Sequence, residues 1–217
     1  MYRSTQLDLP ITHDLPIPHS FVRQEHPTQH LAIVFPGMAY TVHMPVLFYP
    51  TQVLLGRGAD VLRLDYNFTE PEVKALSKDE QTAWFEAAVD AALTIALAQH
   101  AYERITLIGK SIGTLALARC LDHTHTIADA RYIWLTPLLR DEGLIDQIKR
   151  HPHRALFVIG TEDHEYDPAL LAEVQQATNG ETVVIDGANH SLQIGSDVIR
   201  SLDVMKRVIA HLDAFVA

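Results

Sequence analysis

Three residues of this chain have the types and the order of a catalytic triad: Ser111, Asp163 and His190. A serine hydroxyl is a weak nucleophile near neutral pH, so it needs a histidine as base, and the histidine needs an acid that orients it. The three candidates follow one another in the order serine, acid, histidine, which is one of the orders in which this triad occurs. The chemistry that they predict is nucleophilic attack on an acyl carbonyl.

Ser111 lies in the segment Gly109-Lys110-Ser111-Ile112-Gly113, between a predicted strand and a predicted helix. A Gly-x-Ser-x-Gly pattern at such a turn is a nucleophile elbow, which exposes the serine hydroxyl beyond the edge of the sheet. The glycines allow backbones to approach where a Cβ would clash, and the N–H groups that begin the helix can bind an oxyanion. We expect Lys110 to pack behind the nucleophile as a buried, hydrogen-bonded or ion-paired residue more readily than to act in catalysis.

Asp163 and His190 each follow an apolar, strand-like segment by a short loop that contains glycine. The carboxyl ends of parallel strands meet at one edge of a sheet, so these two loops and the elbow should lie together. Glu162 and Asp167 are alternative acids, but Asp163 falls where the loop should turn inward.

A phosphate-binding loop is the main rival interpretation of Gly109-Lys110-Ser111. Such a loop needs a further glycine five positions before the second glycine, and four residues between them that surround the phosphate. That position is Arg104, and the intervening residues form the predicted strand itself. The sequence therefore disfavours a nucleotide hydrolase.

The sequence gives less support for a metal site than for a catalytic triad. The chain has 13 histidines, and the pairs His123/His125 and His151/His153 have a His-x-His spacing, but no third ligand is linked to either pair by spacing. We interpret them as solvated loop histidines, and we predict neither a metal nor an organic cofactor. Cys120, the one cysteine of the sequence, lies in an apolar helical segment and is expected to be a small buried apolar residue.

Strands and helices alternate along most of the sequence. We expect strands over 31–35, 61–64, 105–108, 132–135, 155–159 and 182–185, and helices over 44–57, 77–100, 115–121, 144–149, 168–178 and 197–215. The proline-containing first 28 residues suit one or two short antiparallel edge strands. This order predicts an α/β fold with a mostly parallel sheet of about 7–8 strands and helices on both faces, as a single domain over residues 1–217.

Composition excludes several classes of partner. The net charge of −10 disfavours nucleic acids and anionic membranes, because phosphate groups require clustered lysine and arginine. The first residues lack the apolar run of a signal peptide, and no stretch reaches 18 consecutive apolar residues. We therefore expect a cytoplasmic protein that acts on a small molecule, and the sequence leaves its oligomeric state open.

From about residue 29 to 217 the chain resembles the α/β-hydrolase superfamily. The resemblance rests on the elbow and on four further segments: Ile33–Gly37, Gly58–Asp65, Gly160–Asp163 and Gly187–His190. It implies an oxyanion hole formed by the N–H groups of Ile112 and of Met38, with Ala39 as an alternative to Met38. Many members have a histidine where this chain has Pro36, so the loop that carries Met38 can differ in shape.

The resemblance also bears on the pocket. Large members carry a helical cap between the sixth and seventh strands, but only about 17 residues, 137–153, are available here. The expected pocket is therefore shallow, open and roofed by loop side chains, with Tyr40 and Tyr66 as candidate wall residues or, alternatively, ordinary half-buried tyrosines. The predicted function is a cap-less serine hydrolase for a small carboxylic ester or thioester. An acyltransferase or peptidase with the same triad, and a non-catalytic ligand-binding protein, are the alternatives.

Overall fold

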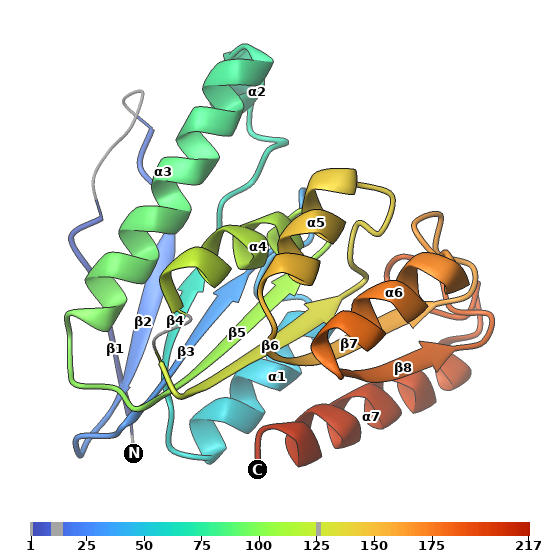
Figure 1. The fold of residues 1–217 in the computed structure, drawn as a ribbon. Coiled ribbons are helices and arrows are strands. Elements are labelled where there is room, and N and C mark those ends of the chain that lie inside the picture. Colours follow the sequence, from blue (N-terminus) through green and yellow to red (C-terminus); the bar gives the residue numbers. More distant parts are fainter. Residues whose placement is uncertain (1, 10–14, 125–126) are drawn as a thin grey trace.

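The computed structural model describes residues 2–9, 15–124 and 127–217, and their strands form one eight-stranded sheet (Figure 1). The strands are β1 (Tyr2–Thr5), β2 (His19–Gln24), β3 (His30–Phe35), β4 (Asp60–Leu64), β5 (Arg104–Lys110), β6 (Asp129–Leu135), β7 (Arg154–Gly160) and β8 (Glu181–Ile185), in the spatial order β1-β2-β4-β3-β5-β6-β7-β8. Strands β3 to β8 pair in parallel, while β1 and β2 are antiparallel. The predicted, mostly parallel sheet with antiparallel edge strands is confirmed.

Helices cover both faces of the sheet (Figure 1). In the described part of the chain they are α1 (Pro45–Gly56), α2 (Pro71–Ala75), α3 (Lys78–Leu97), α4 (Gly113–Thr124), α5 (Glu142–Arg150), α6 (Pro168–Thr178) and α7 (Val198–Phe215). Helices α1 and α7 lie on one face, and α3, α4, α5 and α6 lie on the other. Along β3, Leu31, Ile33 and Phe35 pack toward α3 and α4, whereas Ala32 and Val34 pack toward α1. A strand buried on both faces requires such an unbroken apolar run.

Two details of the helices differ from the prediction. The five-residue helix α2 was not predicted, because it carries no apolar period beyond the single buried Val73. Helix α4 begins at Gly113 and ends at Thr124, so His123 lies in its last turn rather than in a loop. His125, its predicted pairing partner, lies outside the described residues. Helix α3 begins as expected, after a capping box of Ser77 and Glu80.

Strand β3 lies between β4 and β5, so the order in which successive strands are added to the sheet reverses there. The loops that follow β3 and β5 therefore leave the carboxyl edge of the sheet side by side, at a topological switch point where α/β folds bind ligands. None of the helices in the described ranges combines the length and the apolar character that crossing a membrane requires.

Candidate active site

The turn between β5 and α4, where the sequence predicts an elbow, is sharp and closely packed. Ser111 has a backbone φ of 54°, in the left-handed region that is sterically costly for a residue with a Cβ. A Cβ on Gly109 would lie 2.3 Å from the carbonyl oxygen of Gly113, and one on Gly113 would lie 2.4 Å from that of Phe35. Both glycines are therefore required by close backbone contacts, and these contacts hold the strained serine above the sheet.

Ser111, His190 and Asp163 form a continuous chain of hydrogen bonds. The Nδ1 atom of His190 lies 2.8 and 2.9 Å from the two carboxylate oxygens of Asp163, and its Nε2 atom lies 2.9 Å from Ser111 Oγ. With the Nδ1 proton donated to the carboxylate, Nε2 is left to accept the proton of the serine hydroxyl. The three elements that carry these residues are separate in the sequence but end at one edge of the sheet.

Asp163 is held as a carboxylate. Its side chain is fully buried, and burial by itself would raise the pKa of this group. Hydrogen bonds from His190 and from the backbone N–H of Glu165, at 3.0 Å, outweigh burial and lower the pKa of Asp163 below its usual value. An ionised acid is the form that can stabilise a protonated imidazole.

The loops of Asp163 and His190 are packed directly against each other. A Cβ on Gly160 would lie 2.0 Å from the carbonyl oxygen of Ala188, so glycine alone permits this approach. The N–H of Glu162 donates to that same oxygen at 3.0 Å, and the N–H of Gly187 donates to Thr161 Oγ1 at 2.8 Å. These contacts fix the distance between the acid and the base.

The predicted oxyanion groups lie beside the elbow and have N–H groups without a partner. In the described ranges, no hydrogen bond is made by the backbone N–H of Met38, Ala39 or Ile112. The loop that carries Met38 is held by the hydroxyl of Tyr66, which donates to Pro36 O at 3.0 Å. Both Met38 and its alternative Ala39 therefore keep a free donor for an oxyanion.

The two tyrosines predicted as wall residues occupy different environments. Tyr66 is 1% exposed and makes edge-to-face contacts with Phe68 and Phe85, so it belongs to the core and positions the loop of Pro36 rather than lining a surface. Tyr40 is partly buried, and its hydroxyl accepts the N–H of Val46 at 3.1 Å. Its side chain therefore also has a structural partner.

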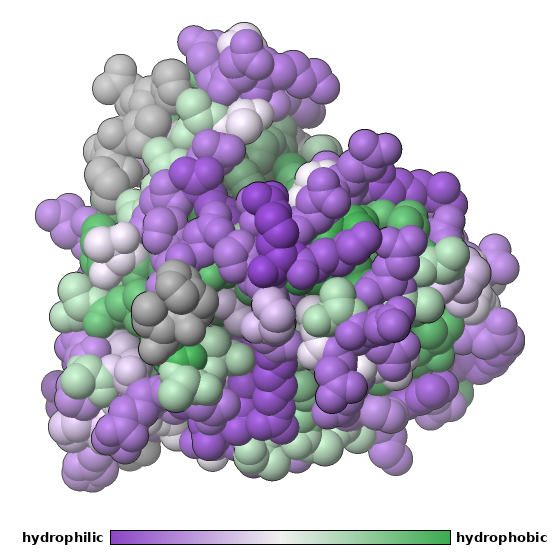
Figure 2. Space-filling model, viewed as in Figure 1, coloured by the Kyte–Doolittle hydropathy of each residue, from purple (hydrophilic) through white to green (hydrophobic). Residues whose placement is uncertain are grey.

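A cleft of about 560 Å³ begins at the predicted oxyanion residues. Met38, Phe68 and Ile112 line one part of it, and Asp141 and residues of α3, α4 and α5 line the rest. The three triad candidates and the two predicted wall residues, Tyr40 and Tyr66, are not among the lining residues. In Figure 2 the face that carries α3 to α6 is mostly hydrophilic, and apolar side chains are visible between the helices. Helices border most of this cleft, and the expectation of a substrate pocket roofed by loops stays a prediction.

The alternative acids have other roles. Asp167 is the N-cap of α6, where its carboxylate accepts the N–H groups of Ala169 and Leu170. Glu162 contributes its backbone N–H to the contact with Ala188, while its side chain is exposed. Neither side chain is hydrogen-bonded to His190, which leaves Asp163 as its partner.

The His151/His153 pair is not the solvated pair that was expected. The ring of His153 lies against those of Tyr132 and Trp134, with centroids 4.6 and 5.7 Å away, and burial lowers the pKa of His153 to about 4. His151 contacts Asp122 at 2.8 Å. Cys120 is buried in α4 as predicted.

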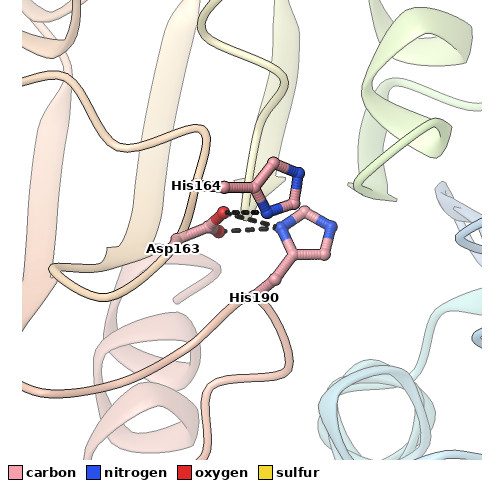
Figure 3. A group of neighbouring side chains, drawn as sticks. All are labelled: Asp163, His164 and His190. Atoms are coloured by element: carbon pink, nitrogen blue, oxygen red, sulfur yellow. Dashed lines mark hydrogen bonds and ion pairs between the residues drawn. The ribbon is translucent and has the colours of Figure 1, made fainter.

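His164 is a neighbour of the triad that the sequence reasoning missed, although it directly follows Asp163. Figure 3 shows its ring beside that of His190, with centroids 4.8 Å apart, and its Nδ1 atom lies 3.6 Å from Asp163 Oδ1. Single ligand atoms of Asp163, His164 and His190 lie within 4.8 Å of one another, so this trio is where a metal ion could be held. Asp163 and His190 are already joined by hydrogen bonds, however, and we assign no metal to this site.

Comparison with known proteins gives structural relatives only. No family model matches this sequence, and no curated protein matches it significantly. Among solved structures, a putative α/β hydrolase from Agrobacterium tumefaciens is 13% identical with a TM-score of 0.71, and the match covers 91% of this chain and 90% of that one. An esterase from Pyrococcus furiosus is 15% identical with a TM-score of 0.68, covering 99% and 91%.

A serine hydrolase without a lid from Xanthomonas campestris is also similar, at 15% identity and a TM-score of 0.65, with 97% of this chain and 94% of that one covered. At such identities the likeness establishes the fold and leaves the activity open. Within the described residues no cap is present over the sheet edge, in agreement with the sequence prediction. The chain therefore has the α/β-hydrolase fold, in a form without a cap.

Proposed function

We propose that this protein is a serine hydrolase that cleaves a small carboxylic ester or thioester through an acyl-enzyme. The observation that carries the proposal is the chain of hydrogen bonds from Asp163 through His190 to Ser111, with every contact at 2.8–2.9 Å. A nucleophile, a base and an orienting acid within such distances are the features that activate a serine.

The reaction follows from the positions of the atoms. Ser111 Oγ attacks the carbonyl carbon as His190 Nε2 takes its proton, and Asp163 stabilises the imidazolium. The free N–H groups of Ile112 and of Met38 or Ala39 donate to the oxyanion. The tetrahedral intermediate collapses when His190 returns the proton to the leaving group. A water, activated by the same histidine, then releases the acid and regenerates Ser111.

The cleft supports a substrate of modest size with an apolar acyl group. Its apolar end is lined by Met38, Ile112 and Leu115, of which Ile112 directly follows Ser111 in the sequence. Charged side chains such as Arg119 and Arg150 line it further along α4 and α5. An acyl chain that extended beyond the apolar end would meet charged groups, which disfavours long chains. The esterase and the lidless serine hydrolase among the structural relatives support the same reaction class.

Labelling with a fluorophosphonate probe, followed by intact mass, tests the proposal. We expect one adduct on the native protein and none on Ser111→Ala, while Ser4→Ala, which changes an exposed serine of β1, should label fully. A folded native protein without an adduct would refute an activated Ser111. A series of p-nitrophenyl esters then tests the substrate class, and faster turnover of long-chain than of acetyl or butyryl esters would contradict a short acyl group.

A further inference from the structure

Lys110, which directly precedes the nucleophile, is a buried cation with an unusual set of partners. Its exposed fraction is 2%, and burying an ammonium group ordinarily requires a carboxylate beside it. In the described part of the chain no carboxylate lies within ion-pair distance of Lys110 Nζ. Contacts other than an ion pair must therefore stabilise the buried ammonium group of Lys110.

The ammonium group contacts three loops at the carboxyl edge of the sheet. Nζ donates to the backbone carbonyl of His190 at 3.1 Å and to Thr136 Oγ1 at 3.3 Å, and it lies 4.6 Å from the centre of the Tyr40 ring. Thr136 follows β6 with a φ of 45°, and Tyr40 lies in the loop after β3. One side chain thus joins the histidine loop, the turn after β6 and the loop of the oxyanion group.

We propose that Lys110 is a positioning residue for His190, and that it sets the distance between the imidazole and the nucleophile. Lys110 and Ser111 are consecutive in the backbone, so the bond from Nζ to the carbonyl of His190 links the base to the elbow independently of the bond from Nε2 to Oγ. This role in catalysis rests on the proposed function, whereas the link itself does not.

The charge of the lysine is sensitive to pH within an accessible range. Burial lowers the pKa of Lys110 to about 8, while the negative charge of Asp163 acts in the opposite direction. The groups in contact with the ammonium are the carbonyl of His190, Thr136 Oγ1 and the ring of Tyr40, and the charge of Asp163 acts from beyond ion-pair distance. Loss of the proton weakens the charge-assisted bond to the carbonyl and the attraction to the ring.

The test compares Lys110→Met, which keeps the length of the side chain but removes its charge, with Lys110→Arg, which keeps a charge. Lys149→Met makes the same change at an exposed lysine of α5 and serves as the control. For each protein the rate of fluorophosphonate labelling is measured from pH 6 to 10, and the Nδ1 proton of His190 is observed by NMR at pH 7.

We expect Lys110→Met to label at least tenfold more slowly than native protein at pH 7, with a shifted or broadened Nδ1 signal, while Lys149→Met matches native. The native rate should fall as the pH rises through about 8, and Lys110→Met should lack this step. Lys110→Arg, where it folds, should recover part of the rate and also lack the step.

A folded Lys110→Met that labels within twofold of native, with the same pH profile, would overturn the inference. If native protein is not labelled at all, the proposed function fails, and the NMR measurement still decides the role of Lys110. An unchanged Nδ1 signal in Lys110→Met would refute the link to His190, and a changed signal would support it.

Discussion

Gly160 ends β7, the strand before Asp163, and packs against the loop that carries His190. Its replacement by alanine should displace His190 and leave Ser111 in place. The added Cβ would lie 2.0 Å from the carbonyl oxygen and 2.5 Å from the carbonyl carbon of Ala188. Cβ contacts below 3.0 Å are essentially never observed, so the two backbones must separate by at least about 1 Å. Ala188 is two residues before His190, and the displacement therefore reaches the base.

The size of the effect follows from this displacement. Overpacking of a rigid interior costs about 1–3 kcal/mol, and a clash with backbone rather than with a flexible side chain places Gly160→Ala near 3 kcal/mol. For a chain of this length that lowers the melting temperature by roughly 6–12 °C. A misplacement of about 1 Å between reacting groups reduces the rate of reaction by about 100-fold.

Urea unfolding and the rate of fluorophosphonate labelling measure the two effects in the same samples. Gly56→Ala is the matched control, because Gly56 ends α1 and a Cβ there would meet nothing within 4 Å. This change should leave labelling unaffected and stabilise the protein by about 0.5 kcal/mol, since alanine favours helix. Native labelling and native stability in Gly160→Ala would refute the claim that this contact fixes the acid and the base.

Three further predictions concern titratable groups. Asp163→Asn should slow labelling of Ser111 by roughly a thousandfold with the circular dichroism spectrum unchanged, because the amide cannot stabilise the imidazolium of His190; a rate within tenfold of native would contradict this. Burial lowers the pKa of both His30 and His153 to about 4, so the unfolded chain binds more protons between about pH 6.5 and 4. The free energy of unfolding should therefore fall as the pH falls through that range, by up to about 1.4 kcal/mol per pH unit for each histidine. When this free energy is measured by urea unfolding at several pH values, His30→Gln should show a smaller slope against pH than native protein. Burial raises the pKa of Cys120, so a thiol reagent such as Ellman's reagent should react with it only after unfolding; rapid reaction of folded protein would contradict this.

The chain order of the strands and the elbow could be predicted because they depend on local patterns. Apolar runs such as 105–108 and 156–159 are long enough to identify buried strands, and Gly109 and Gly113 mark a turn whose chemistry is local. Because the carboxyl ends of parallel strands share one edge of the sheet, the sequence also predicts that Ser111, Asp163 and His190 lie close together. The hydrogen bonds between them agree with that hypothesis.

Other features depend on contacts between residues far apart in the sequence. Tyr66 is a candidate wall residue in the sequence because it follows a strand at the carboxyl edge of the sheet. In the structure its ring packs against Phe68 and Phe85, and its hydroxyl donates a hydrogen bond to the carbonyl oxygen of Pro36. The sequence predicts His153 to be a solvated loop histidine, but its ring packs on Tyr132 of β6. Neither neighbour is visible in a local pattern.

The sequence by itself determined the α/β fold class and the three residues proposed as a triad, because strand runs, glycine turns and residue order are properties of short segments. The tertiary structure decided how the triad is held. The approach of Gly160 to Ala188 and the bond from Lys110 to His190 join loops that are 28 and 80 positions apart in the chain. Such contacts depend on the final twist and packing of the sheet, which no local pattern encodes.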